Sequence, residues 1–253
     1  MIFVLLPAYN EERGLPSVVE KFDAELRRLG RPHRFVVVDD GSRDRTADVA
    51  RELSTRYDLT LIQFPQNRGI QEGFRALIRH AVEHGADDDL AVILDADGTQ
   101  DASVLGALIS AAETRADVAI ASRFRKGGGM RGVPFHRSVL SHGARYTMCL
   151  RFRVPGVRDY SCFYRAYRIS ALRRGLARFG DALIQGKGFS AAAGLIVRLH
   201  TAGVTFTEVP LVLDYGAKAG LSGMRLPETL RGYAGLVFRR GPPPSDGAPG
   251  PRP

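Results

Sequence analysis

The chain has 253 residues, 44% of them hydrophobic and 25% charged, which suits one folded domain with a sizeable core. Two cysteines are too few for a disulfide framework, so we expect a reducing, cytoplasmic setting. No apolar run reaches the roughly 18–20 residues that cross a bilayer, and Met1 leads directly into a strand-like segment, so we expect neither a membrane span nor a signal peptide.

The net charge of +9 is divided unevenly along the chain. Residues 1–122 carry a net charge of −7, whereas residues 123–253 carry +16. Between residues 123 and 174 there are 13 basic side chains and one acid, Asp159. Such a segment favours an anionic partner, either a phosphate group or, by peripheral contact, the cytoplasmic face of a membrane. The basic residues match no nucleic-acid-binding motif, so we expect no nucleic-acid partner.

The first half of the chain alternates strands with helices. Continuous apolar runs predict strands that are buried on both faces, and apolar residues at helical spacing predict helices between them. The predicted strands are 2–6, 35–38, 59–64, 90–94 and 118–121, and the predicted helices are 15–29, 44–56, 70–84 and 102–114. This alternation predicts an α/β fold with a doubly wound, mostly parallel sheet.

The second half follows a different rhythm, which begins with a glycine-rich loop at 127–129. Residues 241–253 consist mainly of Pro, Gly and polar residues, so we expect a disordered tail there. Before that tail, the predicted helices are 136–151, 169–179, 190–200 and 230–240, and the predicted strands are 160–167 and 204–213.

Two carboxylates, Asp95 and Asp97, follow the predicted strand at 90–94 and precede Gly98. Alternate residues of an extended chain face the same side, so both carboxylates can reach one ligand. Open α/β sheets bind ligands at the carboxyl ends of their strands, and paired carboxylates there favour Mg²⁺ or Mn²⁺. The other early strands also lead into polar clusters, which predicts an active-site rim along one sheet edge. Those clusters lie at 7–12, 39–42, 67–69 and 122–123.

Several short motifs, taken in order and spacing, make the chain resemble the inverting family-two glycosyltransferases of GT-A fold. They lie at 7–12 (PAYNEE), 37–42 (VVDDGS), 44–46 (DRT), 67–69 (NRG), 95–97 (DAD), 159–163 (DYSCF) and 208–210 (EVP). The resemblance covers roughly residues 1–225 and is to the dolichyl- and polyprenyl-phosphate sugar transferase branch. It implies one catalytic domain over residues 1–240, with a nucleotide-sugar-binding half (1–122) and an acceptor-side half (123–240).

The resemblance also implies roles for individual residues. A metal held by Asp97, with Asp95 directly or through water, would stabilise the leaving diphosphate, and Arg123 would contact the diphosphate or the acceptor phosphate. Base and ribose contacts would fall on the first two motifs. The residues expected to contact substrates are Pro7, Tyr9, Glu11, Val38, Asp40, Arg68, Asp95, Ala96, Arg123, Arg137, Lys218 and Ser222, and those expected to act in catalysis are Asp97, Arg123 and Asp159.

Two motifs depart from the branch pattern. The branch often places Gln, a metal ligand, and then His after the second aspartate, whereas this chain has Thr99 and Gln100. The third protein ligand is therefore open, and Gln100 is the candidate. The late phosphate-binding pattern is only approximated at 218–225, so Lys218 and Arg225 would have to supply its cations.

Asp159 separates the functional hypotheses. It can form a salt bridge with Arg158 or Arg165, or act as the general base that a hydroxyl acceptor requires. A phosphate monoester, with a second pKa of about 6, is already ionised near neutral pH and needs cations instead. The preferred hypothesis is transfer from GDP-mannose or a UDP-sugar to a polyprenyl phosphate. The alternatives are a same-fold transferase for a soluble hydroxyl acceptor, with Asp159 as base, and a non-catalytic nucleotide-sugar-binding protein.

Overall fold

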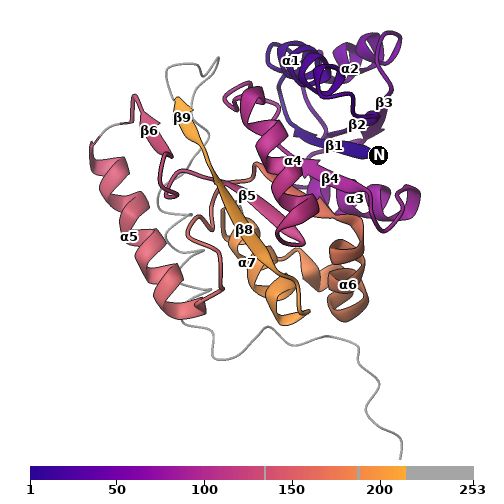
Figure 1. The fold of residues 1–253 in the computed structure, drawn as a ribbon. Helices are drawn as coiled ribbons and strands as arrows, with labels where there is room; N and C mark the ends of the chain where they lie inside the picture. Colours follow the sequence, from indigo (N-terminus) through magenta and orange to yellow (C-terminus); the bar gives the residue numbers. More distant parts are fainter. Residues whose placement is uncertain (134, 187–188, 215–253) are drawn as a thin grey trace, which may run out of the picture.

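The structure is a computed structural model that describes residues 1–133, 135–186 and 189–214 (Figure 1). The strands among these residues are β1 (Ile2–Ala8), β2 (His33–Asp39), β3 (Leu59–Gln63), β4 (Leu90–Ile93), β5 (Val118–Ser122), β6 (Gly129–Arg131), β7 (Arg165–Arg168), β8 (Phe206–Pro210) and β9 (Val212–Asp214). Seven of them form one sheet in the order β3-β2-β1-β4-β7-β5-β8, and β6 pairs with β9. Only β7 runs antiparallel to its neighbours, β4 and β5, so the predicted mostly parallel sheet is confirmed.

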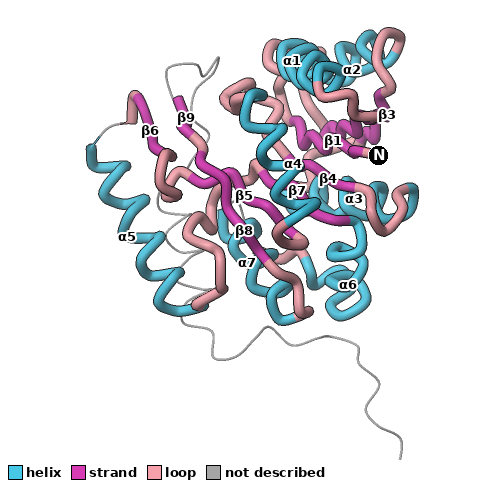
Figure 2. The backbone as a smooth tube through the Cα atoms, in the orientation of Figure 1, coloured by secondary structure: helices cyan, strands magenta, loops and turns pink. Residues whose placement is uncertain are grey.

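Helices cover both faces of the sheet, as Figure 2 shows. The α-helices are α1 (Leu15–Arg28), α2 (Thr46–Ser54), α3 (Ile70–His84), α4 (Leu105–Thr114), α5 (Phe135–Phe152), α6 (Ile169–Phe179) and α7 (Phe189–Thr201), and the 3₁₀ turns are η1 (Ala102–Val104) and η2 (Gly180–Leu183). Among the described residues, no helix combines the length and the apolar character that crossing a bilayer requires.

The apolar strands divide their side chains between two cores. Along β1, Ile2 and Val4 join a core that contains the apolar faces of α1, α2 and α4, whereas Phe3 and Leu5 join a core that contains those of α3, α6 and α7. Successive side chains of a strand point to opposite faces, so a strand between two helical layers must be apolar at every position. The central strands therefore read as continuous apolar runs, and their polar residues are confined to the ends.

Most predicted elements are confirmed, and the differences concern short strands. The strand predicted at 160–167 is shorter, because only Arg165–Arg168 pairs with β4 and β5. The glycine-rich loop contains a three-residue strand, β6, which a hydrophobic pattern cannot mark at that length. The strand predicted at 204–213 is divided into β8 and β9. The predicted helix at 230–240 and the predicted tail at 241–253 lie outside the described residues.

Candidate active site

The polar clusters do meet at one edge of the sheet. Strands β2, β1 and β4 are parallel neighbours, so the loops that follow them leave the same edge. The antiparallel β7 lies between β4 and β5, and Arg165 at its start is paired with both Ile93 and Ile120. The segment that enters β7 therefore arrives at this edge between the Asp95–Asp97 turn and Ser122.

The loops after β1 and β2 hold each other through side chain to backbone hydrogen bonds. The Asn10 amide N–H donates to Ser42 Oγ at 3.0 Å, and Asn10 Oδ1 accepts from the Arg43 amide at 2.9 Å. The Glu11 amide donates to Thr46 Oγ1 at 2.8 Å. Asn10 adopts φ = 57°, a left-handed conformation that Asn tolerates better than most residues. The two motifs are thus one structural unit, and Tyr9 stands half exposed on it.

Asp40 has a structural task that its motif does not reveal. Its carboxylate accepts from the amides of Arg68 at 2.7 Å and Gly69 at 2.9 Å, and its side chain is buried. Gly69 is the N-cap residue of α3 and has φ = 88°. Asp40 therefore fixes the turn at 67–69, while the Arg68 guanidinium lies over the Phe64 ring. A direct contact of Asp40 or Arg68 with the nucleotide stays a prediction.

The Asp95–Asp97 turn is organised by the two residues that depart from the branch pattern. Thr99 donates to Asp97 Oδ1 from its amide at 3.1 Å and from its hydroxyl at 2.7 Å. Gln100 is buried, its Nε2 donates to Asp95 Oδ2 at 3.0 Å, and its Oε1 accepts from the Asp95 amide at 3.1 Å. Gln100 therefore orients Asp95. Its Oε1 has a second lone pair, so the predicted metal coordination by Gln100 stays a prediction.

The donor set at this turn fits a hard divalent cation. Both aspartates are partly exposed, and carboxylate oxygens are the ligands that Mg²⁺ and Mn²⁺ prefer. Within the described part of the chain, no group of three or more His, Cys, Asp or Glu side chains is arranged to hold a metal. The turn thus offers two carboxylates, which matches Mg²⁺, an ion held by one or two carboxylates together with water and substrate phosphates.

Asp159 forms a buried ion pair with Arg123, and not with Arg158 or Arg165 as the sequence suggested. Arg123 Nε donates to Asp159 Oδ2 and Arg123 Nη2 to Oδ1, both at 2.8 Å. Ser161 adds hydrogen bonds from its amide at 3.1 Å and its hydroxyl at 3.0 Å to Oδ1. The Asp159 side chain is 0% exposed and that of Arg123 is 8% exposed.

The electrostatics of this pair bear on the base hypothesis. Burial raises the pKa of Asp159, but the adjacent Arg123 guanidinium and the amides of Arg123 and Ser161 outweigh it and lower the pKa to about 2. A carboxylate of such low basicity, enclosed on every side, is a poor proton acceptor for a substrate hydroxyl. The geometry favours a role in which Asp159 holds Arg123.

Glu208 on β8 supports the same loop, a role that the sequence did not assign to it. Its Oε1 accepts from the backbone amides of Arg158 at 2.6 Å and Asp159 at 2.7 Å. Burial raises the pKa of Glu208 despite these two hydrogen bonds. The signals for it in the sequence were an acid within the predicted strand at 204–213 and its place in the motif at 208–210.

Of the remaining residues that were predicted to contact substrates, some lie in the described part of the structure and others lie outside it. Pro7 and Val38 lie at the ends of β1 and β2, paired with each other, and Ala96 is buried between the two aspartates. Arg137 belongs to α5, but its side chain is outside the described part. Lys218, Ser222 and Arg225 all lie outside the described residues.

Known proteins give an independent view of this arrangement. Dolichol-phosphate mannosyltransferase of Pyrococcus furiosus is 37% identical over 158 residues, 62% of this chain and 42% of that protein. Polyprenol monophosphomannose synthase of Mycolicibacterium smegmatis is 32% identical over 210 residues, 82% of this chain and 75% of that protein. Undecaprenyl-phosphate 4-deoxy-4-formamido-L-arabinose transferase of Pseudomonas paraeruginosa is 32% identical over 180 residues, 70% of this chain and 50% of that protein. The matched stretch thus spans half or less of two of these three relatives.

Solved structures confirm the predicted fold class. Glucosyl-3-phosphoglycerate synthase from Mycobacterium tuberculosis, in complex with Mn²⁺, UDP-glucose and phosphoglyceric acid, superposes with a TM-score of 0.64 at 18% identity, covering 94% of this chain and 77% of that one. The same enzyme with Mg²⁺ and UDP gives a TM-score of 0.62 at 18% identity, with 94% and 76% covered. At this identity the likeness concerns the fold alone. The Glycosyl transferase family 2 profile matches residues 3–176, and the chain therefore belongs to glycosyl transferase family 2.

Proposed function

We propose that this chain transfers a sugar, with inversion, from a nucleoside-diphosphate sugar to the phosphate of a polyprenyl-phosphate lipid. The family and the three relatives, each of which carries a dolichol, polyprenol or undecaprenyl acceptor in its name, support the reaction class. The observation that carries the choice of acceptor is the buried pair of Arg123 with Asp159, because it withdraws Asp159, the candidate base for a hydroxyl acceptor, from contact with a substrate.

The donor would lie along the edge formed by the loops after β1, β2 and β4. Asp97 and Asp95 would hold Mg²⁺ or Mn²⁺, which when bound offsets the negative charge that grows on the leaving diphosphate. Gln100 keeps the Asp95 carboxylate in one orientation, and Thr99 does the same for Asp97. The interlocked loops around Asn10 and Ser42 would fix the nucleoside relative to these carboxylates.

The transfer itself needs little proton chemistry. An ionised oxygen of the acceptor phosphate forms the new bond to the anomeric carbon, while the bond from that carbon to the diphosphate breaks and its electron pair leaves on the nucleoside diphosphate. Attack opposite the leaving group inverts the configuration. The acceptor carries its charge already near neutral pH, so this chain must position it and offset its charge. Arg123, held by Asp159 beside the edge, suits that task.

A donor and acceptor screen tests this function. Purified chain is incubated with GDP-mannose or UDP-sugars and with a short-chain polyprenyl phosphate or its parent alcohol, with Mn²⁺, Mg²⁺ or EDTA, and both nucleotide release and glycolipid are measured. We expect transfer to the phosphate, none to the alcohol, and loss of turnover in EDTA. Transfer to the alcohol alone would overturn the acceptor assignment, and tight donor binding without any turnover would favour the binding-protein alternative.

One substitution and its control test the site in the same assay. Asp97→Ala should abolish turnover and metal-dependent nucleotide binding while the protein stays folded, because it removes one of the two carboxylates of the turn. Asp88→Ala, which removes a carboxylate with a 99% exposed side chain just before β4, should leave both unchanged. Full activity of the Asp97→Ala protein would contradict the metal assignment.

A further inference from the structure

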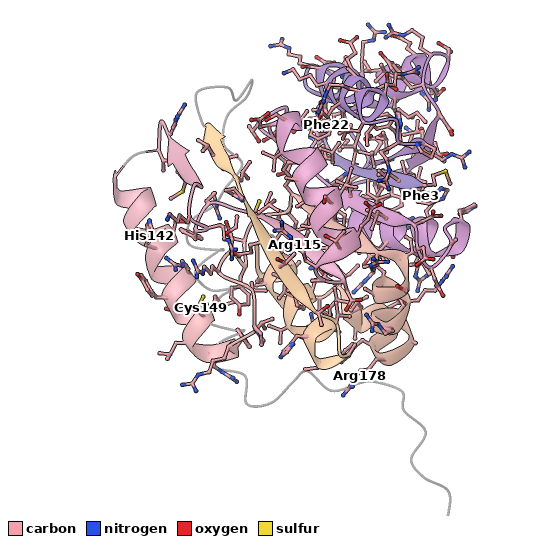
Figure 3. All side chains as sticks on the ribbon, in the orientation of Figure 1. Phe3, Phe22, Arg115, His142, Cys149 and Arg178 are labelled. Atoms are coloured by element: carbon pink, nitrogen blue, oxygen red, sulfur yellow. The ribbon has the colours of Figure 1, made fainter. Side chains whose placement is uncertain are left out.

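Helix α5 presents large apolar side chains to solvent. Tyr146 is 65% exposed and Leu150, one helical turn later, is 72% exposed. On the inner side of the helix, Met148 is buried in the core, and Cys149 and Phe152 pack against it. The helix is therefore held to the domain along one side and is apolar on the opposite side as well. Figure 3 shows it at the margin of the molecule, labelled at His142 and Cys149.

The surroundings of this apolar face are basic. Arg151 and Arg153 are exposed at the C-terminal end of α5, and the loop before β6 exposes Arg125 and Lys126. From residue 123 to residue 174 the one acid is Asp159, whose charge is buried and paired with Arg123. Arg168, Arg173 and Arg174 pair with acids from outside the segment, and the segment as a whole keeps a large excess of positive charge. An aromatic and an aliphatic side chain set among cations is the pattern of a helix that lies in a membrane interface.

The inner side of α5 connects this face to the active site. The Phe124 ring, next to Arg123 in sequence, contacts the His142 ring edge-to-face at 5.1 Å between centroids. The Arg145 guanidinium lies 5.0 Å from the Phe124 ring centroid and equally far from that of Tyr146. A surface that contacts Tyr146 is thus connected to Arg123 through the contacting side chains of Arg145 and Phe124.

We propose that the face of α5 formed by Tyr146, Leu150 and Arg151, together with Arg153 just after the helix, docks on an anionic lipid bilayer and brings Arg123 beside the headgroup layer. The apolar side chains enter the interface and the arginines contact lipid phosphates. The inference deepens the proposed function, since a polyprenyl phosphate presents its phosphate at that surface. It commits to a bilayer, because the face combines apolar side chains with clustered cations.

Vesicle binding tests the proposal without donor or acceptor. The full chain is mixed with vesicles of phosphatidylcholine alone or of phosphatidylcholine with phosphatidylglycerol, and bound protein is measured by flotation. We expect binding to the anionic vesicles only, weakened by salt because exposed charges are screened within about 10 Å at 0.1 M. The double variant Tyr146→Ser with Leu150→Ser should reduce the affinity for these vesicles about tenfold or more, because neither serine can bury apolar surface in the lipid interface.

A matched pair of charge variants separates docking by α5 from general attraction. Arg151 lies over the ring of the next residue, Phe152, as Arg56 lies over Tyr57 and Arg178 over Phe179. Arg151→Gln with Arg153→Gln should weaken vesicle binding, whereas Arg56→Gln with Arg178→Gln, which removes the same charge elsewhere, should not. Equal losses in the two double variants would overturn the proposal.

The chain contains no tryptophan, so the fluorescence of a single introduced tryptophan reports the surroundings of that residue alone. Tyr146→Trp should shift its emission to shorter wavelength on anionic vesicles, and Arg178→Trp should not. No shift at position 146 would refute insertion, and a shift produced by a soluble protein or RNA but not by vesicles would assign the face to another partner. Transfer to a short, water-soluble acceptor phosphate that survives Tyr146→Ser with Leu150→Ser would show that the proposed reaction stands even where docking fails.

Discussion

Arg123 donates a hydrogen bond to each carboxylate oxygen of Asp159 at 2.8 Å. The Asp159 side chain is fully buried, and 8% of the Arg123 side chain is exposed. Asp159→Asn would leave the buried guanidinium without its counter-charge, and loss of one partner from a buried pair costs about 3–5 kcal/mol. We expect a fall of that size in the free energy of unfolding, measured with urea at pH 7. Asp181→Asn, which breaks an exposed pair with Arg79, should cost less than about 1 kcal/mol.

The same pair makes stability depend on acid. The folded-state pKa of Asp159 is about 2, below its ordinary value of 3.8, so its stabilisation is present above pH 3.8 and is lost as the pH falls toward 2. The difference corresponds to roughly 2–3 kcal/mol. Between pH 5 and pH 3, urea midpoints should fall more steeply for the wild type than for Asp159→Asn. Parallel curves would contradict the depressed pKa.

The Asp159→Asn protein also tests the chemistry. If an ionised phosphate is the acceptor, kcat of the folded variant should stay within about tenfold of the wild type, while the acceptor KM rises because Arg123 is held less firmly. Loss of a general base would instead lower kcat by about a hundredfold or more. Steady-state rates with a short polyprenyl phosphate, on protein shown to be folded, decide between these outcomes.

Removing the charge of Glu208 should not lower the free energy of unfolding, in contrast to removing the charge of Asp159. Glu208→Gln keeps the Oε1 acceptor for the amides of Arg158 and Asp159 but removes a charge that burial disfavours. Because burial raises its folded-state pKa above the ordinary 4.5, the wild type loses stability as the pH rises through that pKa. At pH 8 the Gln variant should be at least as stable as the wild type. Glu208→Leu, which leaves the buried Asp159 amide and the partly buried Arg158 amide without their acceptor, should lose at least about 2 kcal/mol.

The sequence predicted the framework better than the roles within it. A strand between two cores must be apolar at every position, so continuous apolar runs identified the strands. Because β1, β2 and β4 are parallel neighbours, their polar C-terminal ends lie at the same edge of the sheet. The partner of Asp159 could not be found in this way. Arg158 and Arg165 are near it along the chain, whereas Arg123 reaches it only because the antiparallel β7 lies between β4 and β5. Likewise, the hydrogen bonds of Gln100 with Asp95 depend on a turn geometry that residue type does not specify.

A substitution of Gln100 can show whether this side chain orients Asp95 or itself coordinates the metal. If Gln100 orients Asp95, Gln100→Glu should weaken Mn²⁺ binding in the presence of nucleotide, because Asp95 Oδ2 loses its donor and gains a like charge. The expected loss is about 10–100-fold, the usual effect of removing a group that orients a metal ligand. If Gln100 itself coordinates the metal, the added carboxylate should keep or increase affinity. Calorimetric titration with Mn²⁺ separates the two, with Asp88→Ala as the control.

Two glycines with left-handed backbones isolate the role of the turn after β2. Gly41 has φ = 65°, and a Cβ there would lie 2.3 Å from the backbone carbon of Gln66, just before the turn that Asp40 holds. Gly30 has φ = 63°, but a Cβ there would meet nothing within 4 Å. Both substitutions to Ala should incur the conformational cost of a left-handed residue, roughly 1–2 kcal/mol.

Only Gly41→Ala must also displace backbone, because the neighbouring atoms at 66–67 are not the end of a flexible side chain. Its free energy of unfolding should therefore fall further than that of Gly30→Ala, by about 1–3 kcal/mol, the range for overpacked sites. Displacement of the turn at 67–69 should also weaken nucleotide binding in Gly41→Ala and leave it unchanged in Gly30→Ala. Urea unfolding and nucleotide titration of the two variants measure both effects. Equal stability losses, with equal nucleotide affinity, would show that the loop at 66–67 yields without cost and that its close approach to Gly41 does not shape the site.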